Sequence, residues 1–237
     1  GIMVWQDFMF ACALYPAEGA LLESIRQEAI DNVKRLRNHP SIVVWCGNNE
    51  CNMNLRSAKK KYEQRGTPEV FERMFRQYSD VYYKTLPEVV AELDPMRPYH
   101  PCSPFSGKGI PSKEAADPSK GDSHYWGVWH SKLPIDNYNT MRSRFFSEYG
   151  FQSFPEFESI KIYAPEERDW AVESEVMSAH QRGGTKANSR IRIYLENEYW
   201  PAKDFPSFVY INHVLQGDAI KTAMEAHRRD KPYCWGT

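Results

Sequence analysis

Short apolar runs alternate with longer amphipathic stretches along this chain, and that alternation limits the fold classes open to it. Met3–Phe10 and Ile42–Gly47 are short and largely apolar, which is typical of β-strands. Between them, apolar residues recur at the spacing of a helix face, at Leu21, Leu22, Ile25, Ala29, Val33 and Leu36. Nearly continuous apolar strands that alternate with helices are typical of a parallel sheet covered by helices. The sequence therefore predicts an α/β fold.

The strand signals continue beyond these two runs. Further strands are predicted at Arg97–Pro104, His124–His130 and Arg144–Tyr149, and Tyr233–Thr237 is the start of one more. A polar loop rich in Gly, Pro, Ser and Lys is predicted at Ser106–Gly121. This gives five strands and the beginning of a sixth.

The helix signals fill the spaces between the strands. Thr67 is the predicted N-cap of one helix, with Pro68 in its first position. Pro87 interrupts the apolar stripe of that helix, and Thr85 with Glu88 forms a capping box for a second helix that reaches Leu93. Two more helices are predicted, one at Ala164–Arg182 and one from the stripe Phe208, Ile211, Leu215, Ala219 and Ala223.

Two parallel α/β architectures fit this order, an open doubly wound sheet and a closed (β/α)8 TIM barrel. The open dinucleotide-binding sheet needs a Gly-rich turn after its first strand, and no such motif follows Met3–Phe10. The barrel is therefore favoured, although five strands and the start of a sixth are fewer than its eight. The expected fold is an incomplete barrel.

Composition excludes several classes of partner. The 30 Lys and Arg residues balance the 31 Asp and Glu residues, so no net charge favours binding to nucleic acid or to a membrane surface. No stretch is long and apolar enough to span a bilayer, and the first residues do not resemble a signal peptide. The five cysteines have no CxxC spacing, which indicates neither a zinc site nor a disulfide framework.

The aromatic content is informative in a different way. The chain has 7 Trp and 14 Tyr, and many of them lie beside Asp, Glu, Asn or His. Aromatic rings stack on the apolar faces of sugars while planar polar groups bind the hydroxyls, so this mixture suits a carbohydrate cleft. Aromatic residues are also ordinary core material, and composition alone does not decide between the two interpretations.

Two glutamates emerge directly from apolar runs at predicted strand ends. Glu50 follows Ile42–Gly47, and Glu148 lies at the end of Arg144–Tyr149. In parallel α/β folds the working residues gather at the carboxyl ends of strands. Because burying a carboxylate is costly unless it is paired, the two glutamates are either catalytic groups or members of structural ion pairs, with Arg35 or Arg144 as partners.

Several motifs in order favour the catalytic interpretation. They are MVWQDFMFACALYP at Met3–Pro16, NHPSIVVWCGNNE at Asn38–Glu50, HYWGVWH at His124–His130, FFSEYGFQSFP at Phe145–Pro155, and the final residues Leu215–Thr237. Together they closely resemble the catalytic domain of β-mannosidases in glycoside hydrolase family two. The resemblance covers nearly the whole chain, so it is more specific than any single motif.

The resemblance implies roles for the residues at the strand ends. Glu50 is expected to be the general acid/base at the end of barrel strand four, and Glu148 the nucleophile at the end of strand seven. Such a pair hydrolyses a glycosidic bond with retention through a covalent intermediate. Asn49 is expected either to bind the sugar 2-hydroxyl or to serve as a turn residue, and Asn48 is predicted to be a turn residue.

Four further residues have more than one interpretation. Trp126 and Trp129 are either stacking platforms for sugar or wall packing. His130 either orients Glu148, contacts sugar or is a hydrogen-bonded structural histidine, and Asp7 either binds sugar or braces neighbouring loops. No metal ion or organic cofactor is expected, because two carboxyl groups and water suffice for the reaction.

The resemblance also indicates what surrounds this segment in a parent enzyme. Residues 1–237 are expected to be one catalytic barrel truncated at both ends, roughly strands three to seven with the start of strand eight. Flanking β domains of the parent chain are the expected partners, and the isolated segment is expected to have little or no activity. The expected substrate is a β-mannoside. The alternatives are another β-glycoside, such as a β-galactoside, β-glucuronide or β-glucosaminide, or a non-catalytic carbohydrate-binding role.

The family resemblance leaves the cellular location open among four compartments. A periplasmic or secreted location is favoured, and lysosomal and cytoplasmic locations are the alternatives.

Overall fold

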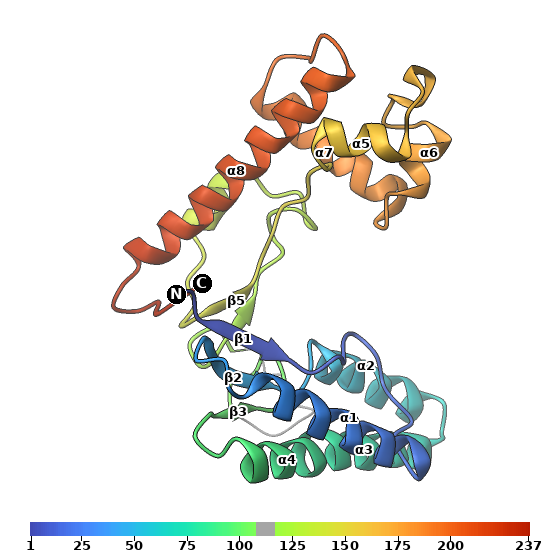
Figure 1. The fold of residues 1–237 in the computed structure, drawn as a ribbon, viewed down its shortest axis with the longest axis vertical. Coiled ribbons are helices and arrows are strands. Elements are labelled where there is room, and N and C mark those ends of the chain that lie inside the picture. The colour runs from blue at the N-terminus through green and yellow to red at the C-terminus, as the bar shows by residue number, and fades with distance from the viewer. Residues whose placement is uncertain (108–116) are drawn as a thin grey trace. The chain divides into compact units, whose positions relative to one another are not determined.

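The computed structural model describes residues 1–107 and 117–237 (Figure 1). It divides into two compact units, Gly1–Ser123 and His124–Thr237. The predicted polar loop Ser106–Gly121 falls largely on residues 108–116, which lie outside the described residues.

The first unit contains a three-stranded parallel sheet in the order β1-β2-β3. Its strands are β1 (Val4–Asp7), β2 (Ile42–Cys46) and β3 (Tyr99–His100). Isolated parallel bridges from Ala11 to Asn49 and from Asn49 to Ser103 continue this order beyond the strand ends. The strands predicted at Met3–Phe10, Ile42–Gly47 and Arg97–Pro104 are confirmed, and each is shorter than its apolar run.

Four α-helices pack around this sheet. They are α1 (Ala20–Leu36), α2 (Cys51–Gln64), α3 (Pro68–Ser79) and α4 (Leu86–Leu93), with α1 against α4 and α2 against α3 (Figure 1). The predicted stripe on α1 is confirmed, because Ile25, Ala29 and Val33 are its buried residues. Thr67 and Pro68 begin α3 as predicted, but the Thr67 side chain makes no capping hydrogen bond.

The predicted capping box at Thr85 and Glu88 is wrong. The chain passes from α3 into α4 through a π-helical segment, Asp80–Thr85, and Thr85 has helical backbone angles with no side-chain cap. Proline has no N–H to donate and crowds the carbonyl four residues earlier, so a regular α-helical ladder is interrupted at Pro87. The wider π turn lies just before that point and carries the helix through without a break.

The second unit contains a two-stranded sheet, made of β4 (Ser123–His124) and β5 (Phe146–Glu148). The strand predicted at Arg144–Tyr149 is therefore confirmed, whereas the one at His124–His130 is correct only for its first residue. Beyond His124 the chain turns, with a hydrogen bond from the Leu133 amide to the Gly127 carbonyl and a positive φ of 78° at Trp129. Packing of Trp129 into the core, described below, accounts for this departure from extended backbone.

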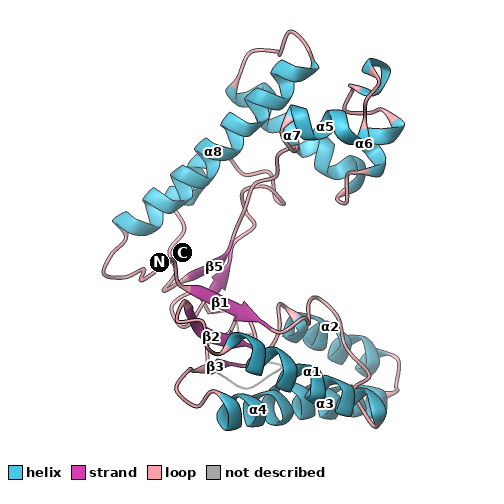
Figure 2. Ribbon diagram, in the orientation of Figure 1, coloured by secondary structure: helices cyan, strands magenta, loops and turns pink. Residues whose placement is uncertain are grey.

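Helices make up most of the second unit (Figure 2). They are α5 (Phe157–Tyr163), α6 (Glu175–Ala179), α7 (Gly184–Glu198) and α8 (Phe205–Arg229), with short 3-10 segments at Ile135–Asn139 and Glu167–Asp169. The predicted final helix is confirmed by α8, on which Leu215, Ala219 and Ala223 are fully buried.

The continuous helix predicted at Ala164–Arg182 is wrong. Tyr163 ends α5, a 3-10 turn follows, and α6 begins only after Ser174. The Ser174 hydroxyl accepts a hydrogen bond from the Met177 amide at 3.2 Å and donates one to the Asp169 carbonyl at 2.7 Å. These N-cap contacts start a new helix at a point where a single long helix would need Ser174 in its interior.

The predicted final strand at Tyr233–Thr237 is not formed as a strand, although its backbone is bonded beside β5. The Trp235 amide donates to the Arg144 carbonyl at 2.9 Å, and the Phe146 amide donates to the Gly236 carbonyl at 3.0 Å. The observed fold thus combines helices with short strands in an α/β arrangement. The strands of the described residues form sheets of three and two, and a closed barrel is not shown by them. Among the helices of the described ranges, none has the length and apolar character needed to span a membrane.

Candidate active site

Glu50 lies at the junction where the polypeptide leaves β2 and enters α2. Its backbone has φ 59° and ψ 6°, in the left-handed region, and its amide donates to the Ser103 carbonyl at 2.7 Å. A non-glycine residue in this region costs roughly 1–3 kcal/mol and persists only where its surroundings impose it. Such strain is common at functional sites, which motivates a functional role for this side chain.

Asn48 fixes the turn that presents Glu50. It is fully buried, its Oδ1 accepts from the Cys51 amide at 3.0 Å, and its Nδ2 donates to the Pro101 carbonyl at 3.1 Å. One amide side chain therefore starts helix α2 and ties it to the segment after β3. The turn role predicted for Asn48 is confirmed.

A thiol joins Asn49 to Glu50. The Asn49 Nδ2 donates to the Cys12 Sγ at 3.7 Å, and the Cys12 Sγ donates to the Glu50 Oε2 at 3.6 Å. The backbone holds these groups together, because the Cys12 amide donates to the Asn49 carbonyl at 2.8 Å. Of the five free cysteines, Cys12 alone is exposed. No sequence pattern selects this cysteine, because its neighbours in the chain are apolar.

The other four thiols are buried. Burial raises the pKa of Cys102 to about 12, and it also raises the pKa of Cys46 and Cys51. A thiol with a raised pKa carries almost no thiolate near neutral pH, and the thiolate is the nucleophile and metal-binding form.

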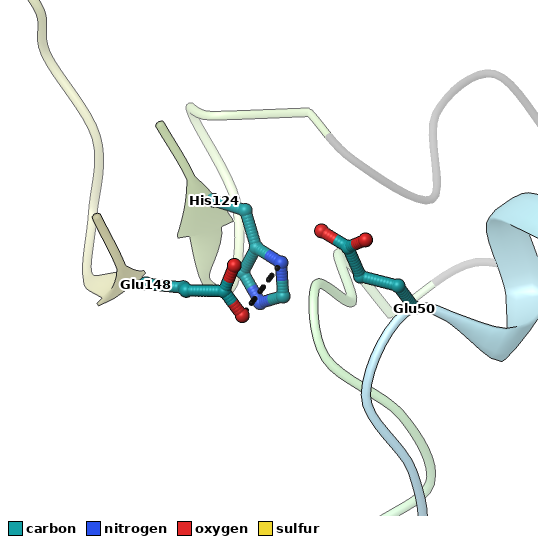
Figure 3. A group of neighbouring side chains, drawn as sticks. All are labelled: Glu50, His124 and Glu148. Atoms are coloured by element: carbon teal, nitrogen blue, oxygen red, sulfur yellow. Dashed lines mark ion pairs between the residues drawn. The ribbon is translucent and has the colours of Figure 1, made fainter. Parts of the chain in front are cut away.

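Glu148 is held at both carboxylate oxygens, by two side chains of its own unit. The Trp126 indole Nε1–H donates to Oε1 at 2.7 Å. The His124 Nδ1 lies 3.4 Å from Oε2, the contact drawn as a dashed line in Figure 3. His124 is nearly enclosed, with 5% of its side chain exposed, whereas 31% of the Glu148 side chain is exposed. The carboxylate is thus oriented by groups on one side and accessible to solvent on another.

His124 was missed as a site residue by sequence reasoning. The signal that selected the two glutamates also applies to it, because His124 is the last residue of β4. His124 and Glu148 both carry atoms that could bind a metal ion.

Trp129 supports the packing interpretation and not the sugar platform. It is 5% exposed, its ring lies 5.1 Å from that of Phe151, and its amide donates to the Tyr194 hydroxyl at 2.8 Å. The packing interpretation of Trp129 is therefore favoured over the sugar platform, because the hydrophobic core covers the ring.

His130 lies next to the residue that binds Glu148. Its ring centroid is 4.7 Å from that of Trp126, at an interplanar angle of 56°, and the histidine is exposed. It can therefore influence Glu148 through the position of the Trp126 indole.

Asp7 has a side-chain contact within its own strand. At the end of β1, its Oδ1 accepts a hydrogen bond from the Trp5 indole at 2.8 Å.

The two arginines considered as structural partners have other contacts. The Arg35 Nη2 donates to the Asn32 Oδ1 at 2.7 Å on the surface of α1. The Arg144 guanidinium lies 5.1 Å from the centre of the Tyr233 ring.

Comparison with known proteins identifies relatives over the entire chain. β-Mannosidase B of Aspergillus clavatus is 39% identical over 241 residues, and β-mannosidase B of Thermothelomyces thermophilus is 38% identical over 247 residues. Both alignments cover 100% of this chain and 28% of the relative. The crystal structure of β-D-mannosidase from Dictyoglomus thermophilum matches with a TM-score of 0.81 and 33% identity, covering 100% of this chain and 27% of that one. No family model matches the chain.

The chain thus spans little more than a quarter of the length of the relatives that it matches. The predicted resemblance is confirmed: the chain is related over its full length to the β-mannosidases and corresponds to one segment of them.

Proposed function

We propose that this chain is the core of the catalytic domain of a retaining glycoside hydrolase that releases terminal, non-reducing β-D-mannose from β-mannosides. The observation that carries the proposal is that both carboxylate oxygens of Glu148 are contacted, one by Trp126 and the other by His124. A nucleophile that attacks a sugar must be fixed in direction and reachable by substrate. The relatives, which are named β-mannosidases, support β-mannose as the sugar.

Glu148 performs the first displacement. One of its oxygens attacks the anomeric carbon while the bond from that carbon to the leaving oxygen breaks, and Glu50 gives its proton to that oxygen. The product is a mannosyl ester of Glu148. The Trp126 indole is a neutral donor, so it orients the carboxylate without cancelling the negative charge that makes it a nucleophile.

Glu50 serves both steps. Once the ester has formed, the carboxylate form of Glu50 takes a proton from water, and the resulting hydroxide equivalent attacks the same carbon from the opposite side and regenerates Glu148. Retention requires the two carboxyl groups to approach within about 5–5.5 Å in the working enzyme. The left-handed backbone of Glu50 and the fixed turn at Asn48 define the direction in which the Glu50 side chain points away from the backbone.

The surrounding residues have supporting roles in this proposal. Asn49 binds the sugar 2-hydroxyl, an interaction that strengthens in the transition state. His130 supports the Trp126 ring, as the contact between the two rings favours. Asp7 braces the end of β1 through its hydrogen bond from the Trp5 indole.

The parent enzyme supplies what this segment lacks. There the segment would provide strands three to seven and the start of strand eight of a (β/α)8 barrel. The two glutamates would lie at the carboxyl ends of strands, where barrel enzymes place their catalytic groups. Further β domains of the parent would complete the part of the subsite that selects mannose.

A mechanism-based trap tests the proposal. The full-length protein that contains this sequence is incubated with a 2-deoxy-2-fluoro-β-mannosyl fluoride, because the fluorine slows hydrolysis of the covalent ester more than its formation. Peptide mass spectrometry is expected to find the label on Glu148, and none in the Glu148→Gln variant. A label on a different carboxylate would overturn the assignment of the nucleophile.

Aryl glycosides test the choice of sugar. The β-mannoside is expected to have the highest kcat/KM among the β-mannoside, β-galactoside, β-glucuronide and β-glucosaminide. A higher kcat/KM for one of the other three would overturn the substrate while leaving the retaining chemistry intact.

A further inference from the structure

A separate cavity lies in the second unit, between α7, α8 and the loop that joins them. It has a volume of about 470 Å³. Ligand pockets for small molecules have volumes of roughly 300–1,000 Å³, so the space is sufficient for one or two sugar rings. Its lining includes neither Glu148 nor Trp126 and His124, which contact the Glu148 carboxylate.

Aromatic side chains form much of its wall. Tyr199, Trp200, Phe205 and Phe208 all line the cavity, and Trp200 is 91% exposed. Phe205 and Phe208 are partly buried and lie nearly parallel, with an interplanar angle of 13°. The cavity therefore combines a fixed aromatic base with one indole ring that is available to a ligand.

Charged groups line the same cavity. They include the ion pair between Arg192 and Glu173, together with Glu196 and Asp204. Hydrogen bonds from the amide and hydroxyl of Ser207 keep the pKa of Asp204 below its ordinary value, so its carboxylate is ionised near neutral pH. The Asp204 Oδ1 accepts a hydrogen bond from the Ser207 amide at 2.8 Å, and this contact caps the N-terminus of α8.

The charge balance selects the class of ligand. Three carboxylates and one guanidinium are the charged groups that line the cavity within the described residues. Excess negative charge disfavours nucleic acids, phospholipid headgroups and sulfated sugars, whose own charges are negative. A purely apolar ligand would remove water from the carboxylates and the guanidinium without replacing the hydrogen bonds to that water, which is costly. A neutral molecule with apolar ring faces and many hydroxyls suits the whole lining, because its ring faces can stack on the aromatic side chains and its hydroxyls can bond to the charged groups.

We propose that this cavity is a second saccharide-binding site for neutral oligosaccharides, in which a sugar ring stacks on Trp200 and its hydroxyls bond to the Arg192–Glu173 pair and to Glu196. The site binds without cleaving, because it brings no pair of carboxyl groups assigned to catalysis. Its occupancy is independent of whether Glu50 and Glu148 hydrolyse β-mannosides.

The seven tryptophans of the chain give a direct readout. Each indole N–H has its own signal in a nitrogen-15 correlation spectrum, and β-1,4-mannotriose is titrated into the labelled protein. The Trp200 signal, assigned with the Trp200→Ala variant, is expected to shift saturably. The Trp126 signal reports separately on the neighbourhood of Glu148, so failure of the proposed function and failure of this site are distinguishable.

A matched control is provided by Trp235, which is 64% exposed in the same unit but does not line the cavity. The backbone amide of Ala202, which does line it, gives the Kd in each variant. Trp200→Ala is expected to raise that Kd at least tenfold, and Trp235→Ala to change it less than twofold.

Three results would overturn the site. They are the absence of a saturable shift at Trp200, equal effects of the two variants, and tighter binding of a sulfated oligosaccharide than of mannotriose.

Discussion

The two oxygens of Glu148 have neighbours of different kinds, and this difference affects how the carboxylate can act. Trp126 donates to Oε1 from a neutral indole N–H at 2.7 Å, whereas a ring nitrogen of the His124 imidazole approaches Oε2 at 3.4 Å. The shorter contact is the stronger restraint on direction. The indole therefore orients the proposed nucleophile, and the His124 side chain, nearly enclosed, limits its rotation.

Replacing Trp126 by phenylalanine tests this restraint. The ring remains but its N–H donor is lost, so the Glu148 carboxylate is no longer fixed at Oε1. Hydrogen bonds to charged groups contribute about 1.5–3 kcal/mol, so kcat/KM of the full-length protein for an aryl β-mannoside is expected to fall roughly 10- to 100-fold. Trp235→Phe is the matched control, with an exposed indole in the same unit. If both variants retain full activity, the indole does not orient the nucleophile.

Asn48 shows how much one buried amide contributes to the path of the chain. Asn48→Ala would leave the Cys51 amide and the Pro101 carbonyl without the partner that now satisfies them. Leaving buried groups unsatisfied costs about 1–3 kcal/mol each, so the first unit is expected to unfold at a distinctly lower urea concentration. Asn54→Ala, at a half-buried position on α2, is the control and is expected to change the midpoint little. Equal midpoints for the two variants would contradict the role given to Asn48.

At the scale of elements, the strands were predictable and the turns that present the site were not. Ile42–Gly47 is short, apolar and β-branched, so its local pattern and its tertiary burial favour the same structure, and β2 forms there. The segment His124–His130 has a similar composition, but burial of Trp129 against Phe151 and Tyr194 turns the chain away after one residue. Contacts between residues far apart in sequence decided that outcome, and no local pattern contains them.

The residues of the candidate site also fall into two groups, those that the sequence pattern selected and those that only the folded structure revealed. Glu50 and Glu148 were found because each follows an apolar run, and Asn48 because its type suits turns. Cys12 and His124 touch these glutamates only in the folded chain, across 38 and 24 residues of sequence. The helix expected at Ala164–Arg182 failed for a local reason, since Ser174 is a strong N-cap residue within that range.

Helix α8 is joined to strand β5 by a buried histidine. The His227 ring stacks on Phe146 at 3.7 Å between centroids, and its Nδ1 lies 2.8 Å from the Thr237 hydroxyl. His227 is 3% exposed, and burial lowers its pKa from 6.5 to about 4. The folded protein therefore holds this ring neutral through most of the acidic range.

This depressed pKa predicts a loss of stability in acid. Between pH 6.5 and about pH 4 the unfolded chain binds a proton at His227 that the folded protein does not, so the free energy of unfolding falls as the pH falls. The full effect is at most about 3 kcal/mol. His227→Phe keeps a stacked ring without a titrating group, and should weaken this pH dependence. Amide hydrogen exchange along α8 at pH 7 and pH 4.5 measures it, and identical pH dependence in the two proteins would refute the assignment.

At the scale of the whole molecule, the proposed chemistry depends on both units. The first unit contributes Glu50 and Asn49, and the second contributes Glu148 with the two side chains that hold it. Neither glutamate is sufficient alone, because one carboxyl group must donate a proton while the other attacks. The proposal therefore assigns hydrolysis to the longer parent protein. This chain spans 28% of the length of the β-mannosidase B from Aspergillus clavatus.

The stereochemistry of the product tests that dependence. If the parent protein brings Glu50 and Glu148 to the separation of about 5–5.5 Å that retaining enzymes use, the sugar passes through an ester of Glu148 and is released in its original configuration. Proton NMR during hydrolysis of an aryl β-mannoside is then expected to show β-mannose first and α-mannose only as mutarotation proceeds. Glu148→Gln should abolish both signals. If α-mannose were released first, water would have attacked directly across a gap of roughly 6.5–9.5 Å, and Glu148 would have acted as a base and not as a nucleophile.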